Sequence, residues 1–231
     1  MSQPTRPIKR IAFFVFPGLT LLDLIGAYDS LRRVALMWID PEVTHRMIGT
    51  QAEITDETGI KFSPDAVYGD LSAFDLLYIP GGLGTRRLMG DEWCIDYLKR
   101  WGPERPIASV CTGALLLGRA GYLQGKRATT HHNAYQLLAP YCREVVRDRR
   151  IVDEGNVITA GGVSSALDLG LYLVERFWGE KARERISEQM EYRAWDLGRP
   201  STRARRGARP KVRPPGTRAR GPGGRSPRPS T

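Results

Sequence analysis

Cys111 is the residue whose surroundings most clearly predict chemistry. Residues 106–110 are mostly apolar, stop at this cysteine, and are followed at once by a helix-like run over 112–120. The pattern predicts a buried strand, a sharp turn and a helix, with the thiol held above the carboxyl end of the strand. The N–H groups and macrodipole of the helix start favour a thiolate, so the thiol is a candidate nucleophile. A small buried core cysteine is the alternative interpretation.

A carboxyl group and a glycine turn are expected near this thiol. Asp23 lies in the first turn of an expected helix, where it either joins a site or complements the helix dipole. Gly81 and Gly82 follow a buried strand, and consecutive glycines there let backbone N–H groups approach a ligand. Thiol, carboxyl and N–H groups are the parts of covalent catalysis. Two facing negative charges would repel, so we expect Asp23 to be partly protonated and able to act as an acid.

Strands and helices alternate over about the first 190 residues, which indicates an α/β fold. We expect strands at 8–16, 45–50, 75–79 and 106–110, a hairpin at 53–62, a short strand at 128–132, a strand pair at 150–160, and helices at 19–33, 92–101, 112–120, 133–139, 164–178 and 180–192. This order predicts a flavodoxin-like three-layer sandwich, with a mainly parallel sheet and helices on both faces. The carboxyl ends of parallel strands share one edge, so Asp23, the glycine turn and Cys111 should converge there.

Positive charge is concentrated at the end of the chain. The formal net charge is +10, but eleven of the 35 Lys and Arg residues lie in 199–231, which contains no acidic residue. That segment is rich in Pro and Gly and lacks the apolar periodicity of a folded unit. We therefore expect a catalytic domain at 1–197 and a basic disordered tail at 198–231. A solvated tail is favoured over a nucleic-acid-binding arm.

Cysteine content and hydropathy favour a cytoplasmic, soluble protein. Cys94, Cys111 and Cys142 are too few and too scattered for a disulfide framework or a zinc knuckle, which fits a reducing compartment. Residues 1–10 contain no apolar signal core, and no run approaches the ~18 apolar residues of a membrane span. We expect no membrane association.

Four motifs together resemble a known family. They are Ser109-Val110-Cys111-Thr112-Gly113-Ala114, Ile79-Pro80-Gly81-Gly82, Arg127-Ala128-Thr129-Thr130-His131, and Phe16-Pro17-Gly18 with Leu22-Asp23-Leu24. Over about residues 8–192 the chain resembles the PfpI-type branch of the class I glutamine amidotransferase-like superfamily, and within it the members that add water to isonitriles. Asp at the centre of Leu-Asp-Leu favours these members over branches that carry Glu there.

The resemblance implies a lyase that converts an isonitrile, R–N≡C, and water into an N-substituted formamide. In this chain Cys111 would attack the terminal isonitrile carbon. Asp23 would protonate the adduct and then activate water, and Thr112 would help to orient the adduct. The resemblance implies no metal and no organic cofactor. It also implies a homodimer in which the second copy completes the site.

The same resemblance assigns the remaining site residues. The turn at Gly81 and Gly82 would contact the adduct through the Gly82 N–H, and His131 would border the site in an architectural role. The chain departs from the family pattern at His132, where relatives carry a bulky aromatic residue. It also departs after about residue 199, where relatives often continue with a further helix.

Other functions remain compatible with the same motifs. The domain also resembles the ligand-sensing half of some transcription regulators, although the residues after the last expected helix cannot form a helix-turn-helix domain. A glyoxalase-like or deglycase-like hydrolase could use the same elbow. A Cys-His protease is disfavoured, because it would need His131 or His132 as the base beside Cys111, where Asp23 is already expected to handle the proton.

Overall fold

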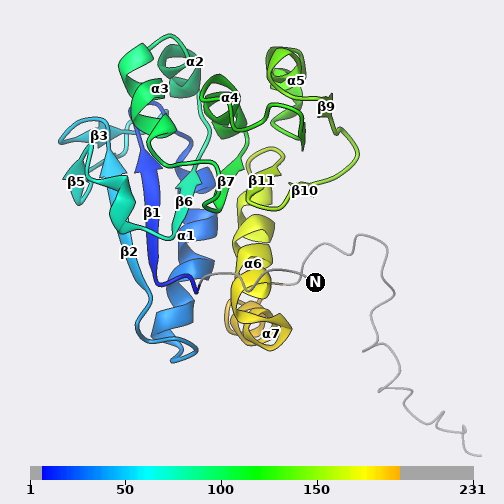
Figure 1. Ribbon diagram of the computed structural model, residues 1–231. Coiled ribbons are helices and arrows are strands. Elements are labelled where there is room, and N and C mark those ends of the chain that lie inside the picture. The colour runs from blue at the N-terminus through cyan, green and yellow to red at the C-terminus, as the bar shows by residue number, and fades with distance from the viewer. Residues whose placement is uncertain (1–6, 193–231) are drawn as a thin grey trace, which may run out of the picture. The chain divides into compact units, whose positions relative to one another are not determined.

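A seven-stranded sheet is the centre of the computed structural model, which describes residues 7–192 (Figure 1). The predicted tail at 198–231 lies outside these residues. In spatial order the strands are β10 (Ile151–Asp153), β11 (Val157–Ala160), β7 (Ile107–Val110), β6 (Leu76–Ile79), β1 (Arg10–Val15), β2 (Thr44–Gly49) and β5 (Ala66–Val67). All neighbours run parallel except β10, which is antiparallel to β11. The predicted mainly parallel α/β sandwich is confirmed.

Two groups of helices cover the two faces of this sheet (Figure 1). One group packs together from α1 (Leu21–Leu36), α6 (Ser165–Trp178) and α7 (Glu180–Gln189), and the other from α2 (Gly84–Leu88), α3 (Glu92–Lys99) and α4 (Gly113–Arg119). Right-handed crossovers explain the division, because the chain leaves β1 towards one edge and later moves from β6 to β7 towards the other. The order therefore reverses between β1 and β6, where sheets of this kind place their ligands.

Burial on both faces explains the apolar runs of the central strands. Every residue of β6 and β7 is buried, and so is β1 after Arg10. Such strands are nearly continuously apolar because helices cover them from both sides. This pattern made them predictable. Among the described helices, none is long and apolar enough to cross a bilayer.

Close packing of α1 against α6 fixes the helix that carries Asp23. A Cβ atom added to Gly26 of α1 would lie 2.8 Å from the Ala166 side chain. A Cβ atom added to Gly170 of α6 would lie 2.8 Å from the backbone of Ala27. Both distances are shorter than side chains tolerate, so the two helices touch at positions where one of them has no side chain.

Several short elements differ from the sequence prediction. The predicted hairpin at 53–62 is present as β3 (Ile54–Thr55) and β4 (Lys61–Phe62), but β5 and the short helices α2 and η1 (Leu71–Ala73) were not predicted. The predicted helix at 133–139 is divided into η2 (His132–Ala134), α5 (Tyr135–Leu138) and η3 (Ala139–Tyr141). Elements of two to five residues carry too little periodicity to be recognised in a sequence.

The predicted strand at 128–132 is wrong in its bounds. Only β8 (Arg127–Ala128) forms, and it pairs with β9 (Glu144–Val145) in a separate two-stranded sheet. The next two residues bond elsewhere: the Thr129 N–H donates to Thr159 Oγ1 at 2.9 Å, and Thr130 Oγ1 donates to the Cys111 carbonyl at 2.7 Å. These bonds draw the segment away from a strand ladder and against the Cys111 turn.

Candidate active site

The turn at Cys111 is a strained elbow, as the sequence predicts. Cys111 directly follows β7 and has φ of 55°, a left-handed conformation that is uncommon for a residue with a side chain. Its N–H donates to the carbonyls of Ala160 at 3.0 Å and Gly161 at 2.8 Å, and its own carbonyl accepts from Thr130. Bonds to two other segments hold this conformation, which is typical of residues placed for chemistry.

Gly81 is the point at which the predicted residues meet. A Cβ atom added there would lie 2.5 Å from the Thr112 nitrogen and 2.8 Å from both Asp23 Oδ2 and Cys111 Cβ. Only a residue without a side chain fits this space. The missing side chain lets the ends of β1, β6 and β7 approach each other, so Asp23 and Cys111 lie together although they are far apart in the sequence.

The Asp23 carboxyl is fully buried and only half satisfied. Its Oδ2 accepts a hydrogen bond from the Gly81 N–H at 3.0 Å. Its Oδ1 is buried and has no hydrogen-bond partner among the described residues. The Tyr78 hydroxyl donates to the Asp23 carbonyl at 2.7 Å and anchors this turn of α1 on β6. A buried oxygen without a partner costs free energy, so this atom is poised to hold or exchange a proton.

Burial shifts both acids towards their neutral forms. Desolvation raises the pKa of Asp23 to about 7, although bonds from the Cys111 thiol and the Gly81 N–H oppose the rise. Desolvation, followed by the charge of Asp23, raises the pKa of Cys111 to about 12, against the opposing influence of the Thr112 N–H and hydroxyl. The partial protonation expected for Asp23 agrees with these values.

The expected thiolate at Cys111 is therefore a wrong prediction. The helix that follows is only seven residues long, and its start cannot offset the loss of water and the facing carboxyl. In the free protein the sulfur holds its proton, and a base is needed to remove it.

Thr112 and Gly82 bond to each other at the floor of the site. The Gly82 N–H donates to Thr112 Oγ1 at 2.9 Å, and Thr112 Oγ1 donates to the Gly82 carbonyl at 3.0 Å. The Gly82 N–H, predicted to contact an adduct, is engaged in this structure, and such a contact needs that bond to open. The Thr112 N–H lies next to the Cys111 sulfur and acts to lower the pKa of that thiol.

His131 lies beside the elbow but does not bond to Cys111. Its Nδ1 accepts from the Asn133 N–H at 3.2 Å and caps the short helix η2, while its ring lies 4.3 Å from that of His132. A Cβ atom added to Gly162 would lie 2.7 Å from this ring. Desolvation, then the charges of His132 and Arg86, lower the pKa of His131. These contacts fit the architectural role and give no support to a Cys-His pair.

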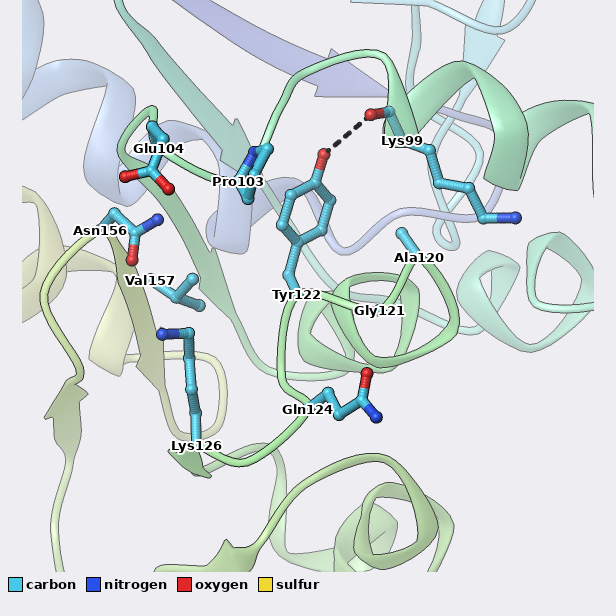
Figure 2. A pocket seen from close by; sticks show the side chains of 10 residues that line it. All are labelled: Lys99, Pro103, Glu104, Ala120, Gly121, Tyr122, Gln124, Lys126, Asn156 and Val157. Carbon is cyan, nitrogen blue, oxygen red and sulfur yellow. Dashed lines mark hydrogen bonds between the residues drawn. The ribbon is translucent and has the colours of Figure 1, made fainter.

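A pocket in the described part of the chain lies away from the elbow. This cleft of about 630 Å³ is lined by residues of 99–104, 120–126 and 156–157, as Figure 2 shows. Glu104 precedes β7 and Val157 begins β11, so the pocket opens at the amino ends of these strands. Cys111, at the opposite end of β7, is only 5% exposed. None of the predicted site residues lines the pocket.

Glu57 and Thr20 belong to the neighbourhood of Asp23 and were missed by sequence reasoning. Thr20 Oγ1 donates to Glu57 Oε1 at 2.9 Å, and the charge of Glu57 raises the pKa of Asp23. Glu57 lies on the predicted hairpin, but nothing in the sequence indicates that the hairpin folds towards the end of β1. Across residues 7–192 there is no cluster of three His, Cys, Asp or Glu that could hold a metal ion.

Comparisons with known proteins agree with this geometry. The model of the DJ-1/PfpI family matches residues 9–176. Isonitrile hydratase of Pseudomonas putida is 36% identical over 202 residues, which cover 84% of each chain. A THiJ/PfpI family protein of Pseudomonas syringae has a solved structure that matches with a TM-score of 0.72 and 29% identity, over 83% of this chain and 78% of that one.

A regulator also shares the domain. The HTH-type transcriptional regulator GbdR of Pseudomonas aeruginosa is 27% identical over 192 residues, which are 80% of this chain and 51% of the regulator. This chain thus spans about half the length of that relative. The family match over most of the described residues, the identity to isonitrile hydratase and the Cys111 elbow at the carboxyl edge of a parallel sheet lead to one conclusion: the chain belongs to the DJ-1/PfpI family.

Proposed function

We propose that this protein hydrates isonitriles to N-substituted formamides, with Cys111 as the nucleophile and Asp23 as the proton carrier. The observation that carries the proposal is the contact of a buried carboxyl with a buried thiol at Gly81, with pKa values of about 7 and about 12. The Asp23 carboxylate beside the Cys111 thiol can accept the thiol proton without help from solvent. The similarity to isonitrile hydratase supplies the substrate class.

In the first step the sulfur adds to the terminal carbon of R–N≡C. The ionised Asp23 carboxyl takes the proton from Cys111 as the sulfur–carbon bond forms, and delivers it to the same carbon. The product is a thioimidate, R–N=CH–S, attached to Cys111. The Thr112 N–H next to the sulfur stabilises negative charge while the proton is in transit.

In the second step water releases the product. Asp23, ionised again, takes a proton from water as the oxygen attacks the thioimidate carbon, and the nitrogen gains that proton. The tetrahedral adduct collapses to R–NH–CHO, and the sulfur leaves and recovers the remaining hydroxyl proton through Asp23. Atoms and charges balance over the cycle with one isonitrile and one water, so no metal or organic cofactor is required.

A homodimer is part of the proposal. Leu22 and Ile25 flank Asp23 on the outer side of α1, Leu83 follows the glycine turn, and all three side chains are exposed. Apolar side chains gathered around a site are a common sign of a protein interface. A second copy on this side would exclude water from the reacting groups, which strengthens their electrostatic interactions.

A ligand-sensing role is the second candidate, because the match to GbdR covers 80% of this chain. A sensor would bind a small molecule at the elbow without turning it over. It would not need the Asp23 proton transfer, so substitution of Asp23 by Asn would preserve binding. This outcome separates it from the enzyme.

The decisive assay follows cyclohexyl isocyanide and its formamide by gas chromatography, without added metal. Wild-type protein should form the formamide, Cys111→Ala should form none, and Asp23→Asn should lose at least about two orders of magnitude in rate. Cys142→Ala is the matched control, because this half-buried thiol lies elsewhere in the fold and should leave the rate unchanged. Full activity of Cys111→Ala would refute the mechanism, and an inert wild type that binds the isonitrile would favour the sensor.

A further inference from the structure

The hairpin of β3 and β4 reaches the end of β1, where the site begins. The Gly18 N–H donates to the Thr55 carbonyl at 2.8 Å, and the Glu57 N–H donates to the Leu19 carbonyl at 3.0 Å. These backbone bonds join the hairpin to the loop between β1 and α1 on both sides of the turn. The hairpin tip is therefore fixed next to the start of the helix that carries Asp23.

Internal bonds make this tip rigid. Asp56 Oδ1 accepts from the N–H groups of Thr58 and Ile60, each at 2.8 Å, and from the Thr58 hydroxyl at 2.9 Å. Asp56 is itself buried, and its bonds lower its pKa. A tight turn of this kind holds Glu57 in one position, although Glu57 is exposed to solvent.

Thr20 connects Glu57 to the reacting groups. Its hydroxyl donates to Glu57 Oε1 at 2.9 Å, and its N–H donates to the Gly81 carbonyl at 2.9 Å. Its carbonyl accepts from the Asp23 N–H at 3.0 Å. One residue thus touches the carboxylate on the hairpin, the glycine turn and the backbone of the proton carrier.

The titratable groups near Asp23 differ in whether they are charged near pH 7. Within residues 7–192, three titratable groups are coupled to Asp23: the Cys111 thiol from the elbow, the Tyr78 hydroxyl from β6, and Glu57 from the hairpin. Burial raises the pKa values of Cys111 and Tyr78, so both are neutral near pH 7. The negative charge of Glu57 opposes the ionisation of Asp23.

We propose that Glu57 is a positioning residue for Asp23: its carboxylate, held by the Thr20 hydroxyl, is placed next to the start of the helix that carries Asp23 and makes that buried carboxyl a stronger base. The inference rests on the proposed function for its purpose, because Asp23 must take a proton from a thiol that holds it tightly. Desolvation is the main cause of the raised Asp23 pKa, and the charge of Glu57 adds a smaller increase. Exposure of Glu57 makes that contribution dependent on salt.

The test is a direct titration of Asp23, which needs no substrate. Carboxyl carbons are labelled with ¹³C, the Asp23 resonance is identified by its loss in Asp23→Asn, and its midpoint is measured at low ionic strength. We expect Glu57→Gln to lower the midpoint by about half a pH unit, and about 1 M salt to remove most of the difference between the two proteins. Thr20→Val, which keeps the charge but frees it, should give a smaller shift in the same direction.

Glu53→Gln is the matched control, because Glu53 belongs to the same hairpin region but pairs with Lys61 at 2.9 Å. This variant should leave the Asp23 midpoint unchanged. An unchanged midpoint in Glu57→Gln, or an equal shift in Glu53→Gln, would overturn the proposal. If the protein hydrates isonitriles, the acidic limb of kcat/KM in Glu57→Gln should move down by the same amount. If it does not, the titration still decides the role of Glu57.

Discussion

At the scale of single residues, the site depends on two acids whose burial separates their proton affinities. Burial raises the pKa of Cys111 to about 12, which favours the protonated thiol, and raises the pKa of Asp23 to about 7. A freely solvated thiolate would react with many electrophiles, whereas a buried thiol reacts only when the adjacent carboxylate accepts its proton. In this arrangement the selectivity of the thiol for electrophiles depends on Cys111 and Asp23 together.

The same burial should cost stability when Asp23 is ionised. Its pKa is raised from 3.8 unfolded to about 7 folded, so its stabilising share is complete below pH 3.8 and is lost as the pH rises through about 7. Asp23→Asn removes that loss. We expect the variant to exceed wild type by roughly 2–4 kcal/mol in the free energy of unfolding at about pH 8 and to show little gain near pH 4. Urea unfolding at both pH values measures this, and an equal gain at both would contradict it.

At the scale of elements, the glycine turn after β6 decides whether the three strand ends can meet. A methyl group at Gly81 has no room, because the Thr112 nitrogen would lie 2.5 Å from its carbon. Gly81→Ala should therefore push the elbow away from α1 and reduce the hydration rate at least about tenfold, with about 1–3 kcal/mol of destabilisation. Rate and urea midpoint measure the two effects.

Gly90→Ala provides the control for this experiment. A Cβ atom there would meet only the Arg87 carbonyl at 3.6 Å, an ordinary contact distance. We expect the rate and stability of this variant to stay near those of wild type. Equal losses in both variants would mean that any alanine is harmful and that the approach at Gly81 is not special.

The long elements could be predicted from the sequence, and the reasons are physical. β1 and β7 are buried on both faces and read as apolar runs, and α6 shows its buried side over four turns. The convergence of Asp23 with Cys111 followed from the topology of parallel strands. The sequence pattern does not show how deeply Cys111 is buried. For this reason the predicted direction of its pKa shift was wrong.

Contacts made by short segments were also beyond prediction. The bond between Gly82 and Thr112 depends on side-chain placement within the folded site, and the approach of Glu57 depends on how a hairpin docks. The residues after β8 do not continue the predicted strand, because Thr129 and Thr130 bond to other elements. In each case tertiary contacts override the local conformational preference of the sequence.

At the scale of the whole molecule, the face beside the site should be an interface between two copies. Leu22 is 47% exposed beside Asp23, and Leu137, at 45% on α5, provides a matched residue elsewhere. We expect the wild type to sediment as a dimer, Leu22→Glu to shift it towards the monomer with a loss of activity, and Leu137→Glu to do neither. Analytical ultracentrifugation of the three proteins is the measurement. A monomeric, fully active wild type would show that one copy suffices.

The contact of α1 with α6 has a consequence for biosynthesis. The ribosome releases Asp23 early and Cys111 midway, but α6, which packs against Gly26 and fixes the helix of Asp23, emerges only after residue 165. A nascent polypeptide that has just passed the elbow therefore carries both reactive groups without the clamp that aligns them. We therefore expect a stalled or prematurely terminated product that stops before α6 to be inactive, because it lacks the helix that aligns Asp23 with Cys111.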